Sequence, residues 1–150
     1  MIGIVFYLEE AYSTMCSAFV GDTLSELTYD ARNLGATHIF VIDKTGKGKF
    51  YQHGDGEIVL EFWDSLDELE AAYKNIRFVY LENEKSLIGH TFYYLQDYDH
   101  PAEAIYITGP NSGSEDVLIG KSGDFVCIKD VADMWSKTAL MLCLYHRKIS

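Results

Sequence analysis

Hydrophobic and polar positions divide the chain into short apolar runs and longer segments with a helical period. The run "IGIVFYL", residues 2–8, is continuous and rich in β-branched and aromatic residues, which indicates a buried strand. Residues 22–35 follow with apolar side chains on one helical face, at Leu24, Leu27, Ala31 and Leu34. The run "THIFVID", residues 37–43, is then a second buried strand. Strand, helix and strand at this spacing predict a βαβ unit with parallel pairing and a right-handed crossover.

Polar residues at both ends of the first helix predict its limits. Thr23 and Glu26 have the spacing of a capping box, in which each side chain bonds to the other residue's backbone N–H. Gly35 stands where a glycine commonly ends a helix. We therefore expect this helix to begin at Thr23 and to end just before Gly35.

The rest of the chain alternates between strands and helices in the same way. Residues 65–76 predict a second helix, capped by Ser65 and Glu68. The last segment, residues 133–148, has a helical period but is apolar nearly all round. We expect it to be buried on two sides, the second of them in a dimer. A glycine- and lysine-rich stretch, residues 44–56, predicts a small hairpin, and four further apolar runs predict strands, at 58–63, 77–82, 104–109 and 124–129.

This alternation predicts a single α/β domain over residues 1–150, with five or six mostly parallel strands flanked by helices. In such sheets ligands bind beyond the carboxyl ends of the strands, where the strand order reverses. Three segments follow predicted strands and form the candidate site: "LENEKS" at 81–86, "GPNSGS" at 109–114 and "IKDVADMWS" at 128–136.

The net charge of −11 and the pI near 4.7 limit how the chain can bind a nucleic acid. A protein that binds phosphates usually presents a basic face, whereas this chain would repel a polyanion unless its cations gather locally. The two densest basic stretches are "KTGKGK" at 44–49 and "HRK" at 146–148. The plainer interpretation of each stretch is the stronger one: solubilising lysines in a turn, and cations that complement a helix dipole.

The remaining composition favours a cytoplasmic protein. Cys16, Cys127 and Cys143 are widely spaced and form no C-x-x-C pair, so we expect neither a zinc site nor a disulfide framework. No apolar run approaches the ~20 residues that cross a bilayer. The first residues lack the basic segment of a signal peptide, so we expect none.

The order of five motifs resembles that of the SPOUT superfamily of knotted RNA methyltransferases, in particular its small SpoU/TrmH-like members. The resemblance covers essentially the whole chain in order, which is more specific than any single motif. The motifs are "IVFY" at 4–7, "NLGATHIFVID" at 33–43, "IYITGPNSG" at 105–113, "VCIK" at 126–129 and "DMWSKTALMLCLY" at 133–145.

The resemblance implies an α/β fold whose C-terminal part is a deep trefoil knot. It also implies S-adenosylmethionine as the cofactor, held largely by backbone groups of the three loops, and a homodimer formed through the first and last helices. The implied reaction is methylation of RNA, a tRNA or rRNA, often at a ribose 2′-hydroxyl, without a metal. The cofactor-binding residues that it implies are Leu81, Glu82, Gly109, Asn111, Gly113, Ile128, Val131, Met134 and Trp135.

Departures from the family pattern fall among the residues of the chemistry. In the family's G-P-E motif, Asn111 occupies the position of the glutamate. In a second family motif, the triplet S-[LM]-N, residues 133–135 are Asp-Met-Trp. Tyr29 occupies the position of the arginine that assists the hydroxyl nucleophile from the first helix of the family. Arg32, one turn away, is the best available basic residue for that role. Ser136 and Lys137 are candidates for contacting the substrate. These three residues, Arg32, Ser136 and Lys137, are the candidate catalytic residues.

Two other functions remain open. The changed motif residues and the acidic charge favour a diverged knotted protein that acts as a cofactor-binding, regulatory or interaction module. A flavodoxin-like nucleotide or phosphate binder would use the 109–114 loop at a helix N-terminus. Plainer interpretations also stand: Gly109 to Gly113 as an ordinary turn, Glu82 as a solvated carboxylate, and Trp135 as a core or interface residue.

Overall fold

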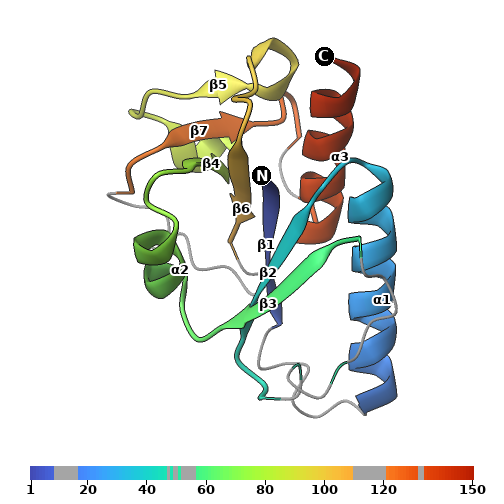
Figure 1. Cartoon of the computed structure of the whole chain (residues 1–150). Helices are drawn as coiled ribbons and strands as arrows, with labels where there is room; N and C mark the ends of the chain where they lie inside the picture. Colours follow the sequence, from blue (N-terminus) through green and yellow to red (C-terminus); the bar gives the residue numbers. More distant parts are fainter. Residues whose placement is uncertain (9–16, 47, 49–50, 52–56, 110–120, 132–133) are drawn as a thin grey trace.

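The computed structural model describes residues 1–8, 17–46, 48, 51, 57–109, 121–131 and 134–150. Within these ranges seven strands form one sheet in the order β3-β2-β1-β6-β4-β7-β5, and every strand pair is parallel (Figure 1). The strands are β1 (Ile2–Leu8), β2 (His38–Asp43), β3 (Val59–Trp63), β4 (Arg77–Leu81), β5 (Tyr93–Tyr94), β6 (Ala104–Thr108) and β7 (Asp124–Cys127). The helices are α1 (Ser17–Asn33), α2 (Leu66–Ala72) and α3 (Ser136–Ile149), with two 3-10 helices, η3 (Glu84–Leu87) and η4 (Leu95–Asp97).

The predicted α/β class and parallel sheet are confirmed. β1 pairs with β2 from Gly3 opposite His38 onward, and α1 connects the two strands as the predicted βαβ unit requires. The sheet has seven strands, one more than the five or six that the sequence predicts, because β5 was not predicted. β5 is only two residues long, Tyr93 and Tyr94, and too short to show a period in the sequence. The predicted hairpin at 44–56 lies largely outside the described residues.

The predicted start of α1 is wrong, and its predicted end is confirmed. α1 begins at Ser17, so Thr23 and Glu26 lie inside it, where backbone N–H groups already have carbonyl partners one turn back. At the other end, Gly35 has a φ of 94° and its N–H donates to the carbonyl of Arg32 at 3.0 Å. Glycine adopts this left-handed conformation without a steric penalty, and it therefore ends the helix.

α2 has the predicted cap but is shorter than predicted. The Ser65 hydroxyl accepts a hydrogen bond from the backbone N–H of Glu68 at 3.2 Å. The helix ends at Ala72, four residues before the predicted end at Ile76. Buried Leu66 and Leu69 hold it against the sheet.

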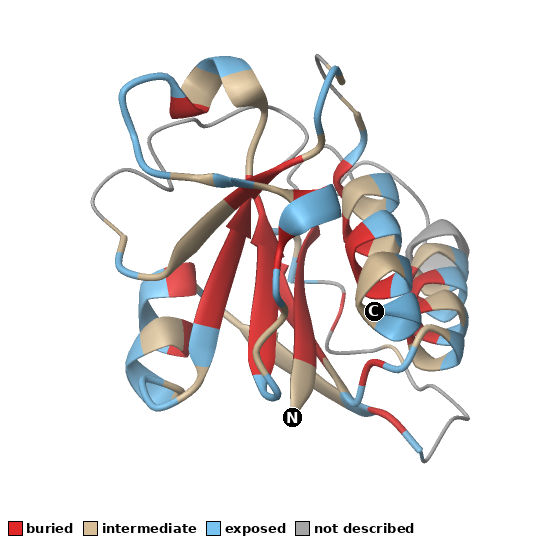
Figure 2. Ribbon diagram, turned by 90° about the horizontal axis from the view of Figure 1, so that it is seen from above, coloured by how far each residue is buried: buried red, intermediate tan, exposed pale blue. Residues whose placement is uncertain are grey.

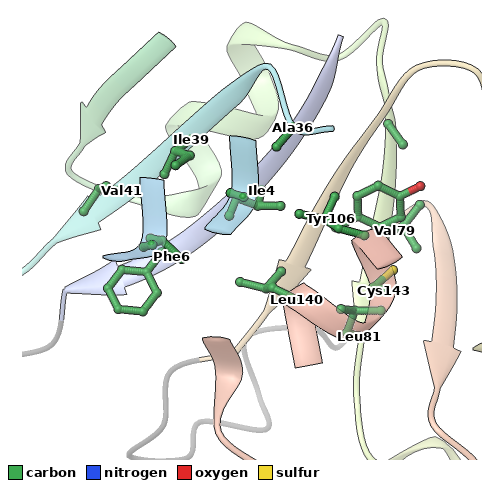
Figure 3. Close-up of a cluster of buried hydrophobic side chains, with 14 of the residues drawn as sticks. Ile4, Phe6, Ala36, Ile39, Val41, Val79, Leu81, Tyr106, Leu140 and Cys143 are labelled. Atoms are coloured by element: carbon green, nitrogen blue, oxygen red, sulfur yellow. The ribbon is translucent and has the colours of Figure 1, made fainter. Parts of the chain in front are cut away.

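Helices cover both faces of the sheet, and Figure 2 shows α2 on one side and α1 with α3 on the other. Leu24 and Leu27 of α1 and Leu140 of α3 pack on one face of the sheet. Figure 3 shows Leu140 and Cys143 among the side chains of that face, which include Ile4, Val79, Leu81 and Tyr106. The opposite face packs against α2 through Val5, Phe40, Tyr80, Ile105 and Ile107.

α3 buries one side and leaves its other apolar side uncovered. Its buried residues are Ser136, Leu140, Cys143 and Leu144. Leu142, Tyr145 and Ile149 follow one another at helical spacing and are exposed. The predicted second apolar side of this helix therefore exists, and within the described chain nothing packs against it. In the part of the chain that the structure describes, no helix is long and apolar enough to span a membrane.

The direction of α3 is fixed by contacts of its last turn. The Arg147 guanidinium donates to the carbonyl of Ala102 at 2.8 Å, just before β6 begins. The Lys148 ammonium donates to the carbonyl of Asn33 at 2.7 Å, at the end of α1 and before β2. The last turn of α3 thus lies at the amino ends of the strands, and its first turn lies toward their carboxyl ends.

Candidate functional site

The carboxyl ends of β6, β4 and β7 lie side by side and define the candidate site, which we call the carboxyl edge. Leu81 at the end of β4 pairs with Thr108 of β6 on one side and with Val126 of β7 on the other. The three segments that leave these strands therefore start from neighbouring positions. Glu82, Gly109 and Ile128, each predicted to bind the cofactor, follow these strands (Figure 1).

Thr108 carries the clearest sign of a ligand at the carboxyl edge. It is only 5% exposed, and its buried hydroxyl has no hydrogen-bond partner among the described residues. A buried hydroxyl without a partner costs free energy, on the order of 1–3 kcal/mol, unless a bound group satisfies it. Next to it, no described atom lies within 4 Å of the place that a Cβ would take on Gly109. The edge thus combines an unsatisfied hydroxyl with space above the backbone.

The segment after β4 is ordered by its own side chains. The backbone N–H of Glu82 donates to the carbonyl of Val126 at 3.0 Å, which extends the pairing of β4 with β7. The Glu82 carboxylate accepts from the N–H of Asn83 at 2.9 Å, and the Asn83 side chain accepts from the N–H of Ser86 at 2.8 Å. These bonds turn the chain into η3 directly after the carboxyl end of β4.

The segment after β7 makes a tight turn. Asp130 has a φ of 61°, a left-handed conformation that aspartate tolerates better than most residues. The N–H of Val131 lies 3.4 Å from the carbonyl of Ile128 and closes the turn. Ile128 itself packs against the core below. Both predicted cofactor residues of this segment therefore lie on a constrained backbone.

A tyrosine of β5 links the segments that follow β4 and β7. The Tyr94 hydroxyl donates to Glu84 of η3, and the Lys129 ammonium lies 5.5 Å from the centre of the Tyr94 ring. The hydrogen bond to Glu84, followed by burial, raises the pKa of Tyr94 to about 12. Tyr94 therefore stays a neutral donor at physiological pH and ties the two segments together.

The first turn of α3 completes the predicted set. Trp135 is the N-cap residue of α3, makes no side-chain capping bond and is 69% exposed. This exposure excludes the interpretation of Trp135 as a core residue. Met134 is half-buried, and Ser136 is buried at the first position of the helix.

Two of the candidate catalytic side chains are engaged elsewhere. Arg32 lies at the amino ends of the strands, where its guanidinium pairs with Glu57 at 3.2 Å just before β3. Within one chain the structure does not bring Arg32 to the carboxyl edge. The Lys137 ammonium lies 3.3 Å from Asp30 and 3.6 Å from Glu26 of α1.

Two predicted cofactor residues, Asn111 and Gly113, lie outside the described residues. Over the described ranges, no group of three or more histidine, cysteine, aspartate or glutamate side chains could hold a metal ion. Thr108 was missed by the sequence prediction. Its signal was present, because it is the polar last residue of the otherwise apolar strand "AIYIT".

No protein-family model matches the chain, and no curated protein matches it in sequence. Solved structures do match it in fold. A protein studied for the 2-OH methylation of C/U34 on tRNA aligns with a TM-score of 0.62 and 19% identity, over 99% of this chain and 96% of that one. The TrmH/SpoU tRNA-modifying enzyme of A. aeolicus aligns with a TM-score of 0.61 and 12% identity, over 99% and 73%.

A third match has the cofactor bound. The SpoU methyltransferase AviRb from Streptomyces viridochromogenes, in complex with AdoMet, aligns with a TM-score of 0.60 and 13% identity, over 99% of this chain and 58% of that one. The chain therefore has the fold of the SpoU/TrmH-type RNA methyltransferases. The α/β fold that the sequence motifs implied is confirmed, whereas the implied trefoil knot stays a prediction.

Proposed function

We propose that residues 1–150 form a single S-adenosylmethionine-dependent RNA methyltransferase domain that acts in the cytoplasm. One observation carries the proposal: the buried Thr108 hydroxyl, which has no hydrogen-bond partner among the described residues, lies at the shared carboxyl edge of three strands. Beside it, no described atom lies within 4 Å of the Cβ position of Gly109. Solved structures of this fold include a methyltransferase with AdoMet bound, which supports the same ligand class here.

The residues of the carboxyl edge fit an adenosyl ligand. Partly buried Ile128 offers apolar surface, and the Thr108 hydroxyl can bond to a hydroxyl or ring nitrogen of the ligand. Backbone groups of Gly109 and of the turn that ends at Val131 would hold its polar atoms. When bound, S-adenosylmethionine supplies a methyl group activated by its positive sulfur.

The reaction would be a direct transfer to an RNA oxygen, of which a ribose 2′-hydroxyl in tRNA or rRNA is the preferred candidate. The substrate oxygen would attack the methyl carbon in line while the carbon–sulfur bond breaks and its electron pair goes to sulfur. The hydroxyl proton would leave to solvent or to a basic group. Positioning the two reactants supplies most of the rate in such a transfer.

Lys137 and Trp135 are the side chains proposed to meet the RNA. Trp135 is exposed at the start of α3, and a flat ring of this kind can stack on a base. Lys137, the second residue of α3, would contact a phosphate by exchanging its ion pairs with Asp30 and Glu26. Buried Ser136 would hold the first turn of the helix. Arg32 could take part only from the other subunit of a dimer.

A knot and a dimer are part of the proposal. After β7 the chain returns past β4 to α3, which packs on β6 and β1, and we propose that it passes through the loop formed by residues 82–103. An experimental backbone trace that leads residues 128–135 outside this loop would exclude the knot. The uncovered side of α3, with Tyr145 and Ile149, would form the dimer together with α1.

A second candidate function is a cofactor-binding module without catalysis. It is favoured by the positions of the candidate catalytic residues: Arg32 lies at the opposite edge, and Lys137 is held by two carboxylates. Such a module would bind the adenosyl ligand but transfer no methyl group.

Transfer of a labelled methyl group from S-adenosylmethionine to unfractionated cellular RNA separates the two candidates. We expect label in RNA with the native protein and a loss of about tenfold or more with Thr108→Val, which removes the hydroxyl but keeps the shape. Glu103→Gln is the control, because Glu103 is exposed just before β6, at the amino ends of the strands. Absence of label, despite binding of the cofactor, would replace the enzyme with the binding module.

A further inference from the structure

The strands β7 and β5, which lie side by side at one edge of the sheet, carry aromatic rings on one face (Figure 1). Tyr80 of β4 pairs with Phe125 of β7, and Cys127 of β7 pairs with Tyr94 of β5. Successive side chains of a strand point to opposite faces, so Phe125 and Tyr94 share the face of Tyr80, against which α2 packs. Among the described residues of these two strands, only Phe125 belongs to the core under α2, and it is only partly buried.

Two more rings and a lysine extend this surface. The His90 ring lies 6.5 Å from the Phe125 ring, and the Phe92 ring meets the Tyr94 ring edge-on, with 5.4 Å between centroids. The Lys129 ammonium lies 5.5 Å from the centre of the Tyr94 ring. His90 and Lys129 are exposed, and the other three side chains are partly buried. We call these five residues, His90, Phe92, Tyr94, Phe125 and Lys129, the aromatic face.

The charge around the aromatic face differs from that of the chain as a whole. The chain has 23 aspartates and glutamates against 12 lysines and arginines, yet residues 85–96 contain neither acid. They include Lys85, which is exposed. The pKa of Tyr94 is raised mainly by its hydrogen bond to Glu84, and the charge of Asp130 adds to this effect, so two carboxylates border the face. With Lys85 and Lys129 they leave this surface close to neutral on an otherwise acidic molecule.

A neutral surface lined by rings fits the bases of a single-stranded nucleic acid. Every base has a flat π-face that stacks on an aromatic ring, and this contact needs no strongly basic surroundings. A duplex instead keeps its bases stacked within the helix and presents its phosphates outward, and phosphates gain little from a neutral surface. The aromatic face also adjoins the carboxyl edge, because Lys129 follows Ile128 directly and Tyr94 bonds to Glu84 of η3.

We propose that the aromatic face is a docking surface for single-stranded RNA, which leads the substrate strand to the carboxyl edge. This inference rests on the proposed function, since RNA is the substrate named there. Bases of the strand stack on His90 and Phe92, and Lys129 meets a phosphate. Because stacking supplies most of the affinity and one or two phosphates are neutralised, a plot of log affinity against log salt concentration has a slope of only about −1.

Fluorescence anisotropy with a labelled oligoadenylate of about 12 nucleotides, and with its duplex with oligouridylate, tests this surface. We expect the native chain to bind the single strand at least about tenfold more tightly than the duplex. Phe92→Leu, which removes the ring but keeps an apolar side chain, should weaken binding of the single strand about tenfold. Tyr93→Leu is the matched control, because this exposed neighbour pairs with Val126 and its ring contacts Tyr98 on the opposite face. Lys129→Gln should flatten the salt dependence.

The outcomes separate this inference from the proposed function when calorimetry with S-adenosylhomocysteine is run on the same proteins. A native chain that binds this ligand but no RNA would overturn the docking surface alone. A native chain that binds RNA through the aromatic face but not the ligand would overturn the proposed function instead. Equal weakening by Phe92→Leu and Tyr93→Leu, or equal affinity for single strand and duplex, would also overturn the docking surface. Should Phe92→Leu not fold, His90→Ala at its exposed position decides, and unchanged RNA affinity there sinks the inference.

Discussion

The imidazoles of His100 and His146 face each other, with 2.8 Å between Nε2 of the first and Nδ1 of the second. The Tyr106 hydroxyl belongs to the same network. Arg147 donates to this hydroxyl at 3.0 Å, and Nδ1 of His100 lies 2.8 Å from it. The contact between the two rings requires a proton on one of the facing nitrogens and a lone pair on the other.

Acidification should therefore destabilise the docking of α3. Burial, followed by His146 and Arg147, lowers the pKa of His100 to about 4, whereas nearby Asp99 acts in the opposite direction. Because the pKa is lower in the folded state than the ordinary histidine value of 6.5, the stabilisation is complete above pH 6.5 and is lost as the pH falls toward 4. Solvent screening keeps the slope below the limit of about 1.4 kcal/mol per pH unit for one proton.

Urea unfolding of the native chain and of His100→Gln, at pH 7.5 and at pH 5, measures this effect. We expect the native chain to lose more unfolding free energy than His100→Gln between the two values. Equal losses in both proteins would show that His100 does not titrate with folding.

Two buried tyrosines allow a matched comparison of hydrogen bonding. The Tyr7 hydroxyl has no hydrogen-bond partner among the described residues, whereas the Tyr106 hydroxyl bonds to both His100 and Arg147. Tyr106→Phe should cost about 1–3 kcal/mol of unfolding free energy, because it leaves buried partners unsatisfied. Tyr7→Phe removes an unsatisfied group and should change the stability by less than about 1 kcal/mol. Chemical denaturation compares the two, and a greater loss in Tyr7→Phe would contradict the assignment.

Gly123 should tolerate no side chain. Its φ of 151° disfavours other residues, and a Cβ would lie 2.5 Å from the Phe78 oxygen, which is backbone and cannot rotate away. Gly123→Ala should lower the unfolding free energy by about 2 kcal/mol or more. Gly109→Ala is the control, since no described atom lies within 4 Å of its Cβ position. Thermal unfolding of both variants checks this, and a milder effect at Gly123 than at Gly109 would be inconsistent with the structure.

The uncovered side of α3 predicts self-association. Tyr145 and Ile149 are exposed on α3, and Tyr29 is exposed on the neighbouring α1. Light scattering should report a dimer for the native chain and a monomer for Tyr145→Glu, because a charge in an apolar interface is costly. Ala71→Glu, an exposed change on α2 at the other face of the sheet, controls for charge alone. A native chain that stays monomeric at high concentration would exclude the dimer.

Local signals in the sequence predicted local structure well. The Ser65 cap, the Gly35 terminus and the first βαβ unit all depend on residues close together in the chain, and each was confirmed. The first helix was predicted to start too late because the capping-box pattern at Thr23 and Glu26 also fits the interior of a helix. A pattern of two residues cannot distinguish these cases.

Relationships across long sequence separations had no signal in a single chain. His100 and His146 are 46 residues apart, and Lys121 and Glu70 are 51 apart. Arg32 was chosen for its proximity in sequence to the position of a family arginine. The structure shows that it lies near the last turn of α1, at the amino ends of the strands. The direction of a helix relative to the sheet, which decides such placements, comes only from the three-dimensional contacts.

The central claim is that the carboxyl edge of β6, β4 and β7 binds an adenosyl ligand, and calorimetry with S-adenosylhomocysteine on the native chain and on Thr108→Val tests it most directly. We predict saturable binding of one ligand per chain, weakened about tenfold by Thr108→Val, which keeps the shape of the side chain and removes its hydroxyl. No measurable binding by the native chain, or equal affinity in both proteins, would contradict the site.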